Sequence, residues 1–430
     1  MADRTRCGKG VLLILDGLGD RGQPLFDGAT PLEAAETPNM DRLVHGGQGG
    51  LVDPLFPGVP VGTHTGTGIL LGIPPADIVR LARGPIEAAG IGLRGPDGEL
   101  LIRANLATLE PTADGLRISD RRAGRISGAE VEELTRELQR IDLGNGIHAG
   151  LHPATGHRAV LSLQGAGLSA RISDTDPGET GPAAVPLPPC RPLDESAEAA
   201  VTAAALNHAS LIIHQHLQQH PLNRRRQAAG LPPANGIICR SPGTRQPARG
   251  LTRHLGLEAA LIAGESTVIG LGHLLGLKVY SDPRFTSLPD TDLAAKIGRA
   301  VTALGDNDLV FIHVKGPDIC AHDRDAAGKR DLLQRIDRAL APLLGEDVVI
   351  GITGDHSTDC NSGRHTGDPV PSLLYFRAGR RDRCHRFDEA GCAGGGLGRL
   401  SGTGFLCALL DAMGAMHKFR EEDLPYYSPP

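Results

Sequence analysis

The sequence predicts an α/β protein with a doubly wound, mostly parallel sheet, and two patterns carry this prediction. Short apolar runs recur along the chain, and each is followed within a few residues by glycine and by acidic or imidazole side chains. Continuous apolar runs are typical of strands buried on both faces of a parallel sheet. Other stretches have apolar residues at three- and four-residue spacing, which is the period of an amphipathic helix. Alternation of the two patterns indicates a layered α/β architecture.

Three of the apolar runs are expected to form neighbouring central strands. They are Val11–Leu15, Leu309–Val314 and Val348–Thr353. The first ends at Asp16, the second leads into Asp318, and the third leads into Asp355 and His356. Because ligands gather at the carboxyl ends of the strands in open α/β sheets, we expect a site at this edge.

Helices are predicted around these strands, and a second kind of unit is predicted between them. The helical stretches are Pro38–Val44, Asp292–Ala303 and Lys329–Leu344. The middle of the chain holds short pieces separated by Gly, Pro and Asp, namely Leu100–Leu109, Arg158–Leu163 and Leu168–Ile172. We therefore expect a smaller inserted α+β domain at 81–235, with residues 1–80 and 236–430 forming the core domain.

Length and composition limit the classes of protein that the chain can belong to. A chain of 430 residues with 40% hydrophobic and 22% charged residues is typical of a globular protein with two domains. A net charge of −6 argues against a nucleic-acid partner. The basic run Arg224–Arg226 is read as a solvated face, with a polyanion clamp as the alternative.

Cysteine usage and the N-terminal sequence suggest where the protein works. The eight cysteines are scattered without any CxxC pair, which is typical of a reducing compartment. The apolar run Val11–Leu15 is too short for a signal peptide or a membrane span. We expect a cytoplasmic protein without a membrane partner; the oligomeric state stays open.

Acidic and imidazole groups at the strand ends predict a metal centre. The candidate ligands are Asp16, Asp318, His322, Asp355, His356 and His365. A set of Asp and His suits Mn²⁺ or Zn²⁺ better than Ca²⁺, which prefers oxygen alone. Six ligands and one hydroxyl, from the turn Gly62–Thr67, suffice for two divalent ions that clamp the oxygens of an in-line phosphoryl transfer. Mg²⁺ and Co²⁺ are further possibilities.

Each candidate ligand also has an ordinary structural interpretation. Asp16 alone is equally well read as a helix N-cap. His322 and His365, taken singly, are more often surface or packed residues. Cys320 and Cys360 lie close to these motifs and are possible soft ligands. The prediction rests on the whole set, because all six candidates fall at or near the strand ends of one expected sheet.

Ten segments resemble the archaeal-type, cofactor-independent phosphoglycerate mutases of the alkaline phosphatase superfamily. They are Asp16–Arg21, Thr37–Leu43, Arg83–Pro85, Asp120–Ile126, Ser173–Pro177, Leu231–Asn235, Lys315–His322, Gly354–Thr358, His365–Pro371 and Gly394–Arg399. The resemblance covers nearly the whole chain in the expected order. It implies an alkaline-phosphatase-like fold and a small phosphorylated hydroxy acid as the substrate.

The resemblance also implies a role for each site residue. One ion is implied on Asp318, His322 and His365, and the second on Asp16, Asp355, His356 and the nucleophile oxygen. The nucleophile position of the family is Thr63, which would form a phosphothreonine as 2- and 3-phosphoglycerate interconvert. The implied substrate contacts are Asp120, Arg121, Arg125, Arg158 and Arg240, with His64 beside the nucleophile.

Three departures from the family pattern leave other functions open. The family's Asp after the nucleophile is His64 here, its nearby His is Thr67, and an expected Lys is Ile269. One alternative is a diverged phosphoryl or phosphonyl transferase, or a phosphodiesterase-like enzyme, of phosphonate or phosphinate metabolism. A second alternative is a metal-binding protein without catalytic activity.

Overall fold

The computed structural model describes residues 8–96, 98–178 and 184–427, and these fall into two compact units. The described residues up to Arg80 and from Pro247 onward form the first unit, and Leu81–Gln246 form the second. The strand β9 (Gly236–Gly243) pairs with β3 (Leu100–Thr112) inside the second unit. Residues 236–246, which the sequence analysis assigns to the core domain, therefore lie in the second unit.

The first unit is built on an eight-stranded sheet that is parallel except for one strand. Its order is β11 (Lys278–Tyr280), β10 (Ala259–Ile262), β12 (Leu309–Val314), β1 (Gly10–Leu15), β13 (Val349–Thr353), β16 (Val370–Tyr375), β2 (Gln48–Asp53) and β17 (Gly398–Ser401). Only β16 runs antiparallel to its neighbours. The three strands predicted as central, β12, β1 and β13, lie side by side.

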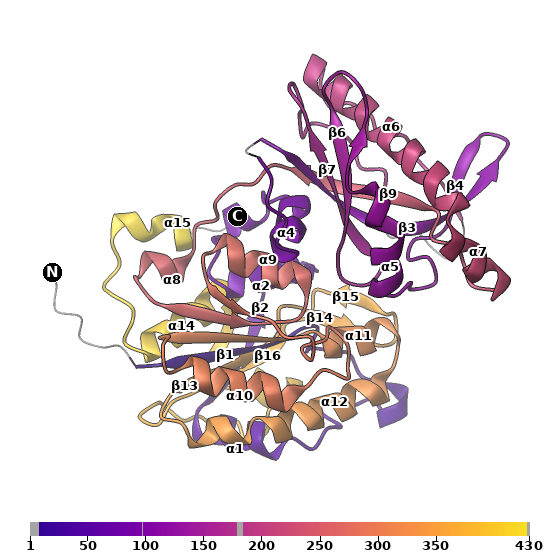
Figure 1. Cartoon of the computed structure of the whole chain (residues 1–430). Coiled ribbons are helices and arrows are strands. Elements are labelled where there is room, and N and C mark those ends of the chain that lie inside the picture. The colour runs from indigo at the N-terminus through magenta and orange to yellow at the C-terminus, as the bar shows by residue number, and fades with distance from the viewer. Residues whose placement is uncertain (1–7, 97, 179–183, 428–430) are drawn as a thin grey trace. The chain divides into compact units, whose positions relative to one another are not determined.

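Helices cover both faces of this sheet, which confirms the doubly wound α/β class (Figure 1). One face carries α1 (Pro38–Gly46), α10 (Leu293–Ala303) and α12 (Ala326–Ala339), and the other carries α2 (Thr63–Leu70), α9 (Ser266–Leu274) and α14 (Gly402–Ala412). Alternate β1 residues Val11, Leu13 and Leu15 join the core under the first group of helices. Such alternation follows from the two-residue period of a strand.

Short elements complete the first unit. They are η1 (Pro24–Phe26), α3 (Pro75–Ile78), α8 (Leu251–His254), α11 (Gly316–His322), η3 (Ala341–Gly345), β14 (Ser357–Asp359), β15 (Arg364–Thr366), α13 (Glu389–Ala393), η4 (Glu421–Asp423) and α15 (Leu424–Tyr427). The helix expected over Lys329–Leu344 ends at Ala339, and η3 follows it. Pro342 explains this break, because proline lacks the amide proton that a continuing helix needs.

The second unit is an antiparallel sheet with its own helices, as expected for an α+β unit. The strand order is β5 (Ile141–Asp142), β6 (His148–Pro153), β7 (Arg158–Gln164), β3, β4 (Gly115–Asp120) and β8 (Val185–Pro186), with β9 also on β3. The helices are α4 (Arg83–Gly90), α5 (Gly128–Thr135), η2 (Arg136–Leu138), α6 (Ala197–Gln219) and α7 (Pro221–Ala228). Leu168–Ile172 forms no strand; Ile172 makes a single bridge to Pro192.

The basic run on α7 is only partly the solvated face that the sequence suggests. Arg224 and Arg225 are exposed, but Arg226 is 5% exposed. The Arg226 guanidinium donates to the carbonyls of Ala123 and Pro232, at 2.8 and 3.0 Å. Arg226 therefore fixes two loops of the second unit. Over the described residues, no helix combines the length and the apolar character needed to cross a membrane.

The close packing of α2 against the backbone of Asp355 leads to a prediction about stability. A Cβ placed on Gly66 would lie 1.9 Å from the carbonyl oxygen of Asp355. Gly66→Ala is therefore expected to lower the free energy of unfolding by ~3 kcal/mol or more, since the helix or the loop must shift. Gly298→Ala in α10 is the matched control, because nothing lies within 4 Å of the added Cβ. The control should gain about 0.5–1 kcal/mol. Equal denaturant midpoints for the two variants would contradict this packing.

Candidate metal and phosphoryl-transfer site

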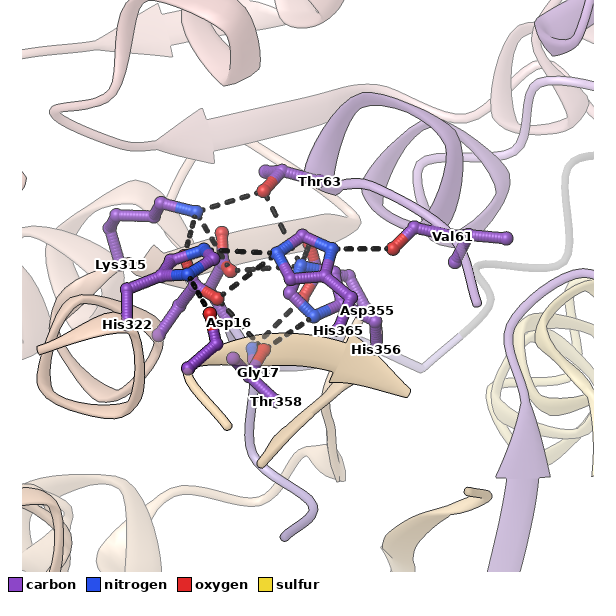
Figure 2. A network of polar contacts seen from close by, with 12 residues as sticks. Asp16, Gly17, Val61, Thr63, Lys315, His322, Asp355, His356, Thr358 and His365 are labelled. Atoms are coloured by element: carbon purple, nitrogen blue, oxygen red, sulfur yellow. Dashed lines mark hydrogen bonds and ion pairs between the residues drawn. The ribbon is translucent and has the colours of Figure 1, made fainter. Parts of the chain in front are cut away.

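The six predicted metal ligands lie together in the first unit, at the carboxyl end of the central strands (Figure 2). Asp16 follows β1, Asp355 and His356 follow β13, and Asp318 and His322 lie on α11 after β12. His365 reaches the same place from β15. Asp16 caps none of the described helices, so the N-cap interpretation does not hold. Neither Cys320 nor Cys360 belongs to any candidate metal group among the described residues.

The first candidate group consists of Asp318, His322 and His365. The Nε2 atoms of His322 and His365 each lie 3.4 Å from an Asp318 oxygen. The two Nε2 atoms lie 3.2 Å from each other. Donors bound at about 2.0–2.1 Å to one tetrahedral ion stand roughly 3.3 Å apart. The spacing of the three donors therefore suits one divalent cation.

The outer nitrogens of both imidazoles face backbone carbonyls. His322 Nδ1 lies 2.8 Å from the Gly363 oxygen, and His365 Nδ1 lies 2.7 Å from the Val61 oxygen. A carbonyl only accepts a hydrogen bond, so the proton of each neutral ring belongs on Nδ1. Burial lowers the pKa of His322, which favours the neutral ring. Both Nε2 lone pairs then point at each other, an arrangement that a cation between them would stabilise.

The second candidate group is centred on Asp16. His356 Nε2 lies 3.3 Å from Asp16 Oδ1 and 3.7 Å from Asp355 Oδ2. Asp318 can pair with Asp16 and His356 as well as with the first group. These carboxylates and the His356 ring are at most 1% exposed. Asp16 also forms a third group with His313 and Asp355. Overlapping donor sets that share Asp318 and Asp16 fit a pair of neighbouring ions.

The site holds more buried negative charge than positive charge. Burial and the charge of Asp16 raise the pKa of Asp355 to about 7. Burial also opposes ionisation of Asp16 and Asp318, but the Lys315 ammonium holds the pKa of both carboxyls below the ordinary range. Lys315 Nζ lies 3.0 Å from Asp16 and 2.6 Å from Asp318. One ammonium cannot neutralise both Asp16 and Asp318, and divalent cations would supply the missing charge.

Thr63 is the first residue of α2 and directs its hydroxyl at this group of side chains (Figure 2). Its Oγ1 accepts a hydrogen bond from Lys315 Nζ at 2.9 Å and lies 3.4 Å from His356 Nε2. The N-terminus of a helix and an ammonium both stabilise negative charge on a nearby oxygen. His64 follows on the same turn, where its Nε2 lies 3.2 Å from Thr65 Oγ1.

Four supporting residues in the site were not predicted as site residues. Lys315 joins Thr63 to the carboxylates, and His313 Nε2 lies 3.0 Å from Asp16 Oδ2. Thr358 Oγ1 donates to Asp318 at 2.8 Å, and Thr67 Oγ1 donates to Asp355 at 2.9 Å. Lys315 lies shortly before the predicted ligands Asp318 and His322, and this proximity could have identified it as a site residue from the sequence. His313 lies inside an apolar run, and nothing in the sequence marks it as a site residue.

The predicted substrate contacts other than His64 lie in the second unit, and two of them, Arg121 and Arg240, lie against the buried Asp176. Arg121 Nη2 donates to Asp176 Oδ1 at 2.5 Å, and Arg240 Nε lies 3.8 Å from Asp176 Oδ2. Asp120 accepts from the backbone amides of Arg122 and Gly124, so it shapes the turn. The same turn holds Arg125, whose φ is 57°. Arg158 begins β7, opposite Asn105 on β3.

Arg103, Arg121, Arg125, Arg158 and Arg240 are together called the arginine cluster. Arg103 is the member that was not predicted from the sequence. It is 4% exposed, and its Nη1 lies 3.7 Å from Glu87. Neither its Nε nor its Nη1 has a hydrogen-bond partner within the described part of the chain. Burial, and then the charges of Arg83, Arg158 and Arg240, lower the pKa of Arg103 well below its ordinary value. Unsatisfied buried donors amid several cations are suited to binding an anion.

The chain is similar to known proteins over nearly its whole length. A family model described as 2,3-bisphosphoglycerate-independent phosphoglycerate mutase matches residues 45–223. Proteins of that name from Methanopyrus kandleri and Thermococcus kodakarensis are each 39% identical to the chain. The alignments cover 95% and 96% of this chain and 97% and 98% of those proteins.

Two solved structures share the fold over nearly the full length. The PH0037 protein from Pyrococcus horikoshii has a TM-score of 0.78 and 32% identity, covering 97% of this chain and 100% of that one. The cofactor-independent phosphoglycerate mutase from Thermoplasma acidophilum has a TM-score of 0.64 and 31% identity, covering 95% and 100%.

Proposed function

Because the chain belongs to the family of 2,3-bisphosphoglycerate-independent phosphoglycerate mutases, we propose that it interconverts 2- and 3-phosphoglycerate through a phosphothreonine at Thr63. The observation that carries this proposal is the Thr63 hydroxyl, which lies 2.9 Å from Lys315 Nζ and beside two overlapping sets of metal ligands. A hydroxyl in such surroundings is activated as a nucleophile. We also propose a cytoplasmic location, which the described cysteines support because all of them are free thiols.

The donor sets suggest how two divalent ions would be held. Asp318, His322 and His365 would hold one ion. Asp16, Asp355, His356 and Thr63 Oγ1 would hold the other, since His356 Nε2 lies near all three of its companions. The mixture of imidazole and carboxylate favours Mn²⁺ or Zn²⁺, with Mg²⁺ or Co²⁺ as alternatives. Bound ions would lower the pKa of the Thr63 hydroxyl and stabilise the charge on the transferring phosphoryl oxygens.

Thr63 and Lys315 act in the first half of the proposed reaction, in which the phosphoryl group moves from the substrate to Thr63. Thr63 Oγ1 forms a bond to phosphorus as the bond between phosphorus and the glycerate oxygen breaks. The hydroxyl proton of Thr63 passes to water, and the departing glycerate oxygen takes up one proton from water, so the protons balance. Lys315 holds the attacking oxygen at 2.9 Å and places positive charge beside it. In the second half, the other glycerate hydroxyl attacks the phosphothreonine and restores Thr63.

The arginine cluster of the second unit is proposed to bind the anionic substrate. Guanidinium groups form paired hydrogen bonds with carboxylate and phosphate oxygens. Arg103, Arg121 and Arg240 supply such groups around Asp176 and Glu87. We infer that Arg125 and Arg158 contribute to the same binding, with Asp120 shaping the turn that presents Arg125.

The departures from the family pattern at His64, Thr67 and Ile269 do not outweigh the case for phosphoglycerate interconversion. Thr67 donates to the predicted ligand Asp355, and Lys315 supplies a cation at Thr63 although Ile269 replaces a lysine. The relatives described above give no support to phosphonate or phosphinate metabolism. Family membership and the retained Thr63 hydroxyl speak against a protein without catalytic activity.

An assay coupled to enolase tests the proposal. The purified protein, given 3-phosphoglycerate and Mn²⁺ or Zn²⁺, should produce 2-phosphoglycerate at a rate that a chelator abolishes. Lack of turnover with either metal, together with metal-dependent cleavage of a nitrophenyl phosphate or phosphodiester, would instead favour the diverged transferase. Metal binding without activity on any phosphoryl ester would favour the non-catalytic alternative.

Arg103→Met is expected to raise the KM for phosphoglycerate by ~10–100-fold, because a charged hydrogen bond contributes roughly 1.5–3 kcal/mol. The kcat should change little, since this side chain would bind ground state and transition state alike. Glu87 keeps Arg83 as a partner at 3.8 Å, so the buried carboxylate is not left alone. Arg117→Met is the control, because Arg117 is exposed and its one ion pair among the described residues is with Glu110. A change in kcat at constant KM would contradict the binding role.

A further inference from the structure

A buried amide lies on β3 of the second unit, close to members of the arginine cluster. The side chain belongs to Asn105, which is 6% exposed. Its Oδ1 atom is buried and has no hydrogen-bond partner within the described part of the chain. A buried acceptor in this state costs free energy unless a ligand or a water molecule donates a hydrogen bond to it.

The strand register places Asn105 on the same face of the sheet as three arginines. Residues at alternate positions of a strand share a face, and so do residues directly opposite each other on neighbouring strands. Arg103 is two residues before Asn105, and Arg240 on β9 lies directly opposite Arg103. Arg158 on β7 lies directly opposite Asn105. Ala104, between them on β3, joins the apolar core on the other face.

Asn105 differs from the buried carboxylates that adjoin these arginines. Glu87 lies 3.7 Å from Arg103 Nη1, and Asp176 accepts from Arg121 Nη2 at 2.5 Å. Both carboxylates are therefore paired with cations. Asn105 Oδ1 is instead a neutral acceptor that is still open to a ligand.

A hydroxy acid offers two kinds of group to such a face. Its carboxylate and phosphate oxygens accept hydrogen bonds from guanidinium groups, which can only donate. Its hydroxyl group also donates a hydrogen bond, and no arginine can accept it. A carboxamide oxygen accepts that bond without adding a negative charge that would repel the anion.

We propose that Asn105 Oδ1 accepts a hydrogen bond from the free hydroxyl group of phosphoglycerate, and so makes the second unit selective for a hydroxy acid. This inference rests on the proposed function, because it takes phosphoglycerate as the ligand of the arginine cluster. The same acid without its hydroxyl group leaves Asn105 Oδ1 buried and unpaired. It therefore binds more weakly, although its charges are the same.

Two phosphonates test the proposal by calorimetry. In the first, a CH₂ group replaces the bridging oxygen of 3-phosphoglycerate, so no phosphoryl group can be transferred; the second also lacks the hydroxyl group. The wild-type protein with its metal ions should bind the hydroxylated ligand at least ~10-fold more tightly. Asn105→Leu, of similar size but apolar, should bind both ligands within about twofold of each other. Asn105→Asp should bind both more weakly and keep the preference, because it retains an acceptor but adds a negative charge.

Thr108→Val is the matched control on the same strand. Thr108 is also 6% exposed, but it faces the other side of the sheet, where its hydroxyl donates to the Pro233 carbonyl at 2.8 Å. This variant should keep the wild-type preference for the hydroxylated ligand.

The wild-type protein alone can overturn the proposal, by binding the two phosphonates equally well or by binding neither. A preference that persists in Asn105→Leu would also overturn it, because Asn105 Oδ1 would then bind an ordered water only. Turnover of 3-phosphoglycerate in the enolase-coupled assay is a separate measurement. Turnover without a hydroxyl preference would contradict the role of Asn105 and leave the proposed function intact.

Discussion

Replacing Thr63 with alanine is expected to lower the kcat of phosphoglycerate interconversion by at least ~10⁴-fold, which is typical for loss of a covalent nucleophile. The reason is the position of Thr63 Oγ1, 2.9 Å from Lys315 Nζ and 3.4 Å from His356 Nε2. The other two threonines of α2 make different contacts: Thr65 Oγ1 lies 3.2 Å from His64 Nε2, and Thr67 Oγ1 donates to Asp355. Rates are measured with the enolase-coupled assay.

Thr63→Ser is the matched control for this substitution. Serine keeps the hydroxyl and removes only a methyl group, so the variant should retain activity within about tenfold of the wild type. Mass spectrometry of acid-quenched wild-type enzyme should find the phosphoryl group on the peptide that contains Thr63. Activity of Thr63→Ala close to the wild-type rate would rule out the phosphothreonine, whatever the metal content of the variant.

Asp318→Ala should remove bound metal and lower kcat by about 10³-fold or more. Asp318 is the only described carboxylate that belongs both to the group with His322 and His365 and to the group with Asp16 and His356. Its loss should therefore weaken both ions at once, and elemental analysis should find fewer than half of the wild-type ions in these sites.

Asp323→Ala is the control for Asp318→Ala. Asp323 is exposed and follows His322 directly, so it tests the loss of a nearby charge without the loss of a ligand. The control should keep its metal and its rate. If Asp318→Ala retained the wild-type number of tightly bound ions, the shared-carboxylate arrangement would be wrong, even if activity fell.

Much of the fold follows from the sequence because its central strands are buried on both faces. Val11–Leu15 and Leu309–Val314 are entirely apolar or nearly so, and every residue of β1 and β12 is buried. Parallel neighbours then bring the residues after each strand to one edge of the sheet. That is why six candidate ligands from both ends of the chain can be predicted from the sequence alone.

Other features depend on tertiary contacts that leave no local pattern. Lys315 is 6% exposed; the sequence places it near the predicted ligand Asp318 but does not show that its ammonium is buried between carboxylates. Arg103 is similarly hard to predict, because it lies within β3 and its burial depends on tertiary contacts. The assignment of residues 236–246 to the second unit depends on the pairing of β9 with β3, which local sequence does not encode.

The position of β1 at the centre of its sheet has a consequence for how the chain is made. Gly10 pairs with Leu309 and with Val349, and β1 has no other strand partner in the described structure. At a synthesis rate of ~5–20 residues per second, this apolar segment waits about 15–60 s on the ribosome before either partner emerges. The antiparallel unit between them is translated during that interval and has its own core. Nascent β1 is therefore a natural client for chaperones, and its pairing is a slow, late event in folding.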